Sequence, residues 1–257
     1  MQIKLLVRNR KNEIMLETSG EEIHALYEHA LQEGDCIEIS TGEECLIQVK
    51  LDETLAESIL YLPEGRFVYP IPSEMETCYA ENAFSGEKHM FSVKVLTEEE
   101  AYASSLLSLN AYDRPEGTGA YPHASANIVT RGDSCFYARN AIDGVKENSS
   151  HGAYPYHSWA GGAREDLEYT VDFGREVSVD SVCFYLRADF PHDTYWKSLD
   201  VTFSDGTSMP ANFIKTTDGQ RLDVGGKTTT YIHLKNFKQI SEPLSWAALT
   251  QIEVYGN

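Results

Sequence analysis

The sequence predicts a mainly β protein built from two β-sandwich domains. Short runs with apolar residues at alternate positions recur along the chain, and turns rich in glycine, proline, asparagine and aspartate separate them. Helical periodicity is confined to the first half of the chain. A change of composition near residues 110–125 marks the boundary between the two domains.

Length and charge also favour two domains. The chain has 257 residues, 42% of them hydrophobic, which is enough for one large core or two modest ones. The net charge is −19, with −14 on residues 1–124 and −5 on residues 125–257. Because this charge repels phosphate backbones and anionic lipids, we expect neither nucleic acid nor a membrane surface as a partner.

The first domain, residues 1–110, is predicted to be a small β-sandwich with an inserted helix. Ser19 and Glu22 fit a capping box, an apolar face at helical spacing follows, and Gly34 suits a helix end, so we predict a helix over residues 20–33. The strands predicted after this helix cover residues 36–40, 45–51, 58–62, 66–71 and 89–96.

The second domain, residues 125–257, is predicted to be an antiparallel sandwich or jelly roll. Thr97 opens a second helix that we expect to end near Leu107, and a segment rich in glycine, proline, alanine and asparagine follows it as the linker. Apolar residues then alternate in residues 167–173 and 182–186, and Asp205-Gly206 predicts a hairpin turn.

Cysteine usage and the absence of apolar segments predict a cytoplasmic protein. The five cysteines are odd in number and have no Cys-x-x-Cys spacing, which argues against a disulfide framework and a structural zinc site. The start of the chain lacks the apolar region of a secretory signal. No apolar run approaches the roughly 20 residues that span a bilayer.

Several short motifs occur in the order typical of one known family. They are Ala-Ile-Asp-Gly at residues 141–144 with an asparagine and a tryptophan after it, Tyr-Thr-Val-Asp-Phe-Gly at 169–174, Phe-Ser-Asp-Gly at 203–206, and Ile-Glu-Val-Tyr-Gly at 252–256. Residues from about 124 to 257 therefore resemble the discoidin-like family, which includes factor V/VIII type C domains and family 32 carbohydrate-binding modules. The resemblance implies a galactose-binding-like jelly roll that recognises glycans.

The resemblance also implies a structural calcium ion between the Asp-Gly loop and the terminal strand. Calcium prefers about 6–8 oxygen ligands, which carboxylates and loop carbonyls supply. Asp143 and Glu253 match the two carboxylate ligands of the family. The further donors that we expect are Asn140, Asn148 and Ser150. A turn-stabilising Asp143 and a solvent-facing Glu253 are the alternative.

Two segments carry the side chains expected to bind a glycan on loops at one end of the barrel. Sugar sites pair an aromatic surface with polar groups that bind vicinal hydroxyls. The first segment supplies Arg187, Asp189, His192, Asp193, Tyr195 and Trp196. The second segment supplies His151 and Tyr154, and Arg131 is a further candidate. Alternatively, Arg187 and Asp189 form an ion pair that braces the sandwich, while Trp159 is expected in the core.

These residues favour a non-catalytic carbohydrate-binding protein. The alternative is a glycan-active hydrolase or lyase that uses Asp189, Asp193 and His192, because paired carboxylates carry out glycoside hydrolysis. No Gly-x-Ser-x-Gly elbow, phosphate-binding glycine loop or His-Glu-x-x-His pattern is present. Two sugar classes stay open, a uronate bound by the Arg187 guanidinium and a neutral galactose-type sugar.

Overall fold

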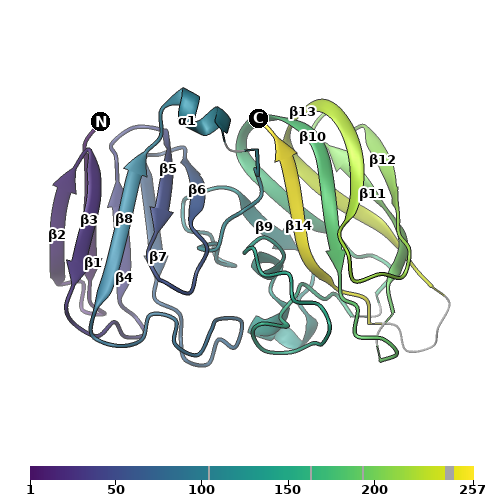
Figure 1. The fold of residues 1–257 in the computed structure, drawn as a ribbon, viewed down its shortest axis with the longest axis horizontal. Helices are drawn as coiled ribbons and strands as arrows, with labels where there is room; N and C mark the ends of the chain where they lie inside the picture. The colour runs from purple at the N-terminus through teal and green to yellow at the C-terminus, as the bar shows by residue number, and fades with distance from the viewer. Residues whose placement is uncertain (104, 163, 193, 241–245) are drawn as a thin grey trace.

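The first 95 residues form two antiparallel four-stranded sheets packed face to face (Figure 1). The computed structural model describes residues 1–103, 105–162, 164–192, 194–240 and 246–257. One sheet has the order β2 (Ile14–Gly20), β1 (Ile3–Arg8), β4 (Cys36–Ser40), β7 (Arg66–Pro70). The other has the order β3 (Glu22–Tyr27), β8 (His89–Val95), β5 (Cys45–Lys50), β6 (Ser58–Leu62). Alternate residues of both sheets bury one hydrophobic core.

The predicted helix over residues 20–33 is wrong, because its first half is strand β3. Ile23, Ala25 and Tyr27 point into the core, while the residues between them are exposed. The apolar positions therefore satisfy a period of two as well as the helical period. All six residues of β3 pair with β8, and this long-range pairing decides between the two periods.

The other elements predicted in this half are confirmed with small changes of boundary. Strands β4 and β6 have the predicted limits, and β5, β7 and β8 each end one residue early. The second helix, α1 (Glu98–Ala103), starts as predicted because Thr97 and Glu100 form a capping box. It ends well before Leu107, whose backbone N–H donates to the carbonyl of Val254 (2.7 Å).

The second half is an antiparallel β-sandwich, as predicted (Figure 1). Its strands are β9 (His123–Ala126), β10 (Tyr169–Leu186), β11 (Trp196–Phe203), β12 (Ser208–Asn212), β13 (Gln220–Gln239) and β14 (Leu249–Gly256). The strand order is β12-β11-β13-β10-β14, and β9 also pairs with β10. The predicted hairpin at Asp205-Gly206 connects β11 to β12.

Strands β10 and β13 are long and contribute to both layers of this sandwich. The first part of β10 pairs with β9 and the second part with β14, with a break in register between Asp172 and Val177. Gly174 lies at this break with φ of +66°. A Cβ atom there would approach the Tyr121 ring to 2.5 Å, so this bend requires glycine.

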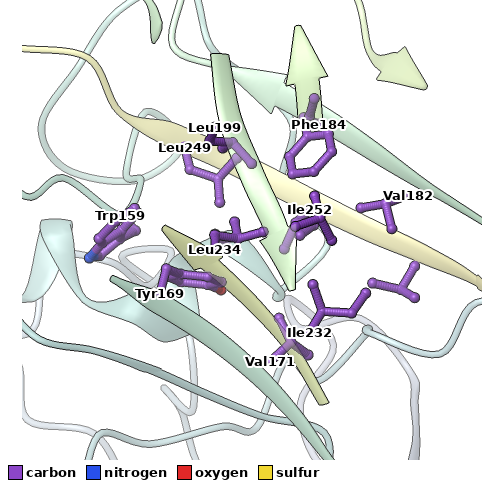
Figure 2. Packing of buried hydrophobic residues seen from close by; sticks show 14 of the residues in the cluster. Trp159, Tyr169, Val171, Val182, Phe184, Leu199, Ile232, Leu234, Leu249 and Ile252 are labelled. Carbon is purple, nitrogen blue, oxygen red and sulfur yellow. The ribbon is translucent and has the colours of Figure 1, made fainter. Parts of the chain in front are cut away.

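One hydrophobic core fills the space between these layers. Figure 2 shows Tyr169 and Leu234 from one layer packed near Phe184 and Ile252 from the other. Trp159 is fully buried among them, as expected, and its ring centroid lies 4.9 Å from that of Tyr169. The predicted alternation in residues 167–173 and 182–186 is confirmed, because all the apolar residues at those positions are buried.

Residues 105–120, which lead into and include most of the predicted linker, are packed against both halves. Residues 105–110 run along the free edge of β14, where Ser108 Oγ donates to the Ile252 carbonyl (2.9 Å). Ala111, Tyr112 and Ala120 then belong to the core of the first half. The chain therefore contacts the second sandwich, returns to the first, and enters the second again at β9. No helix in the described ranges has the length and apolarity needed to cross a membrane.

Candidate functional site

The loop end of the second sandwich gathers a cluster of one carboxylate and two imidazoles. Asp189 lies three residues after the end of β10. Its carboxylate bonds His151 Nδ1 at 2.5 Å and His192 Nδ1 at 3.5 Å. Both histidines expose at least half of their side chains, whereas that of Asp189 is mostly buried. The structure thus brings together members of the two predicted segments, which are separated by 38 residues in sequence.

Asn148 connects the two segments that carry this cluster. Its side-chain amide donates to the carbonyls of Leu186 and Thr217, each at 2.9 Å, and its own carbonyl accepts the Ala188 N–H at 2.8 Å. These bonds fix the loop that carries His151 against the end of β10 that carries Asp189. Asn148 is therefore a positioning residue in this arrangement.

The histidines keep Asp189 ionised. Burial raises the pKa of Asp189, but the hydrogen bonds and charges of His151 and His192 lower it by more, so the pKa lies below its usual value. A carboxylate in this state accepts hydrogen bonds and does not donate a proton. This favours a role in binding hydroxyl groups over a role as a general acid.

Arg187 is a buried structural residue. Its backbone N–H donates to the Ala248 carbonyl (2.9 Å), and its guanidinium Nη2 donates to the Trp246 carbonyl. The side chain joins the end of β10 to the segment that leads into β14. The Arg187 guanidinium thus connects two segments at the loop end.

Trp246 is the aromatic residue that the sequence analysis missed. It is 46% exposed, and its carbonyl accepts a hydrogen bond from Arg187, so its backbone lies at the same loop end as Asp189. A Cβ atom on Gly162 would lie 3.6 Å from the indole, which places Trp246 beside residues 161–162. The signal in the sequence was a tryptophan three residues before the terminal strand.

Trp196 was expected in an exposed loop, and this expectation is wrong. The residue begins β11, and none of its surface is exposed. Its ring lies 4.7 Å from that of Phe237 and 5.9 Å from that of Trp159, in the core. A ring with no exposed surface offers no face to a sugar.

The other predicted residues make contacts of their own. Tyr195 packs partly against the core and makes an edge contact with Phe190. Tyr154 stacks on His157, and its backbone N–H donates to Thr77 of the first half (2.8 Å). Arg131 pairs with Asp133 and lies over the Phe136 ring. Asp193 lies outside the described residues.

Asp143, the first predicted calcium ligand, is the centre of a buried polar network. Its Oδ2 accepts a hydrogen bond from His157 Nε2 (2.7 Å) and lies 3.7 Å from Arg139 Nη2. Its Oδ1 accepts the Val145 N–H (3.0 Å), which stabilises the turn. Asn140, a predicted donor, is fully buried, and its amide donates to the Ser134 carbonyl (2.9 Å).

Glu253, the second predicted calcium ligand, is also bound to side chains of this chain. Lys146 Nζ lies 2.5 Å from Oε1, and the Tyr255 hydroxyl donates to Oε2 (2.7 Å). Ser150 is half-buried nearby in sequence. Among the residues that the structure describes, no three His, Cys, Asp or Glu side chains cluster as a metal site. Both carboxylates that the resemblance assigns to calcium thus have partners within this chain.

No family model matches the sequence, and no curated protein matches it. Several solved structures are similar to part of the chain. A fucose-binding module of Streptococcus pneumoniae has 13% identity and a TM-score of 0.43, over 60% of this chain and 99% of that one. The family 32 module of C. perfringens NanJ in complex with galactose has 15% identity and a TM-score of 0.39, over 51% and 91%. The lectin domain of lectinolysin complexed with Lewis B antigen has 15% identity and a TM-score of 0.42, over 53% and 93%.

Proposed function

We propose that the second sandwich is a non-catalytic carbohydrate-binding domain whose glycan site is the loop end with Asp189, His151, His192 and Trp246. The observation that carries the proposal is the half-exposed indole of Trp246 on the same loop end as a hydrogen-bonded His-Asp-His cluster. An indole face accepts the C–H face of a pyranose, and the cluster supplies both donors and acceptors for vicinal hydroxyls. The motif resemblance to family 32 modules points the same way.

We infer that the preferred ligand is a neutral, galactose-type sugar. Asp189 carries a negative charge next to the exposed histidines, so a uronate carboxylate meets repulsion at the centre of the site. The guanidinium that would bind a uronate, that of Arg187, donates instead to the Trp246 carbonyl. Binding that weakens for the acidic member of a matched pair of oligosaccharides supports this choice.

A glycan-active enzyme is the alternative. Such an enzyme needs a general acid whose pKa is raised above its usual value. The lowered pKa of Asp189 disfavours this role for it. Release of reducing sugar or of an unsaturated product, abolished by Asp189→Asn, would establish the enzyme instead.

Titration calorimetry with hits from a glycan array tests the binding site. A sugar that covers the exposed part of Trp246 buries roughly 100 Å² of apolar surface, worth roughly 2.5 kcal/mol, so Trp246→Ala should weaken binding about 70-fold. Asp189→Asn should weaken it as well, because the acceptor charge is lost. Met90→Ala removes an exposed apolar side chain from the first half and is the matched control. Unchanged affinity in both site variants would refute the location.

A further inference from the structure

Two side-chain contacts join the Asp143-Gly144 turn directly to the terminal strand. The Lys146 ammonium contacts the buried carboxylate of Glu253 on β14 at 2.5 Å. The Gly144 N–H donates to Oε1 of Gln251, also on β14, at 3.2 Å. These contacts connect the two parts of the chain that the family resemblance expects a calcium ion to bridge.

The Lys146 ammonium is held in place from a second side. It lies 4.8 Å from the centroid of the Tyr185 ring, on β10 beside β14. The cation therefore has a carboxylate on one side and an aromatic face on another.

The predicted metal-binding carboxylates are also shielded by positive groups. Glu253 faces Lys146, while Asp143 faces Arg139 and also accepts a hydrogen bond from His157. A divalent ion needs several oxygen ligands, and here it would also have to lie close to an ammonium and a guanidinium. Each carboxylate oxygen that the ion would use already accepts a hydrogen bond or an ionic contact.

We propose that Lys146 takes the place of the calcium ion: its ammonium group, bound to Glu253, joins the Asp-Gly loop to β14. The loop that runs on to Asn148 and His151 is then anchored by the chain itself, independently of divalent metal. This proposal concerns the anchoring of the loop and does not depend on which ligand the domain binds.

Thermal unfolding of the full chain in calcium and in chelator is the first test. A metal bound only by the folded state raises the melting temperature by mass action. We expect the same melting temperature, within about 2 °C, in millimolar calcium chloride and in EDTA, and no calcium retained after equilibrium dialysis. A larger rise in calcium, or one calcium retained per chain, overturns the proposal.

A double-mutant cycle tests the role of the lysine itself. Lys146→Met keeps the apolar stem and removes the charge, which leaves the carboxylate of Glu253 without its cation and should lower the melting temperature by about 5 °C. In a Glu253→Gln background the same change should cost less than half as much, because the charge to be neutralised is gone. Equal losses in both backgrounds, or no loss in either, overturn the proposal.

Two further variants separate this pair from a general effect of charge. Lys146→Arg keeps a cation and should retain at least half of the stability that Lys146→Met loses. Lys4→Met removes a lysine from the exposed pair with Glu17 and should change the melting temperature by less than about 2 °C. If Lys146→Arg falls as far as Lys146→Met, the ammonium charge is not what anchors the loop.

Discussion

The second sandwich needs residues 105–110 for its stability, so the fragment 125–257 should be much less stable than the fragment 105–257. The shorter fragment removes the segment that covers the edge of β14 and also the first half of β9. Ser108 and Asn110 are fully buried in the intact chain. The sequence-based boundary at residue 125 therefore cuts through packed structure.

The size of the effect follows from the hydrogen bonds that are lost. Five bonds link residues 105–110 to the rest of this sandwich. They are Leu107 N to Val254 O, Ser108 Oγ to Ile252 O, Val254 N to Ser108 Oγ, Gly256 N to Ser105 O, and Asn110 N to Ile142 O. At about 1 kcal/mol each, their loss costs about 5 kcal/mol, a large part of the roughly 5–15 kcal/mol that stabilises a typical domain.

Urea unfolding of the two fragments, followed by tryptophan fluorescence, measures this difference. We expect a cooperative transition for 105–257 and a much lower midpoint, or none, for 125–257. In the intact chain, Ser108→Ala should cost about 2 kcal/mol, because it leaves the Ile252 carbonyl and the Val254 N–H unpaired. Midpoints that agree within error, together with an unaffected Ser108→Ala, would refute the reasoning.

Two other variants test the buried groups. The hydrogen bond with buried Asp113 raises the pKa of His123, so this pair stabilises the fold at low pH, and its contribution is lost as the pH rises through that pKa. His123→Gln should therefore lower the free energy of unfolding more at pH 5.5 than at pH 8.5. A loss that does not depend on pH contradicts this. Trp196→Ala should cost about 3–5 kcal/mol in urea unfolding, whereas Trp246→Ala should leave the midpoint nearly unchanged, and the reverse order would contradict the burial of Trp196.

The mainly β class and most of the strands were predictable because alternation is a local property. Strands β4 and β6 were located to the residue: Gly34-Asp35 and Thr41-Gly42 bound β4, and Pro63-Glu64-Gly65 follows β6. Strand β3 was not, because Ile23, Ala25 and Tyr27 fit an alternating pattern while the same stretch also fits a helical one. Only pairing with β8, more than 60 residues later in the chain, distinguishes the two.

The sequence predicted which polar residues the candidate site contains, but it did not predict which of them contact one another. Asp189, His151 and His192 were all candidates, and the structure brings them together. Their partners were not predictable, because spacing in the sequence does not reveal which distant groups meet. The same limit applies to Glu253, whose cationic partner Lys146 precedes it by 107 residues.

The two tryptophans show why the exposure of a loop residue depends on strand limits. Both lie at or just before the start of a strand. Trp196 is already the first residue of β11 and pairs with Gln239, so its side chain faces the core. Trp246 lies three residues before β14 begins, outside the ladder, where the alternation of a strand does not direct its side chain inward. The position at which a strand starts, to within a few residues, thus decides whether a tryptophan is buried in the core or exposed to a ligand. The limits of the neighbouring strand must therefore be known before a binding role is assigned to a tryptophan near a loop.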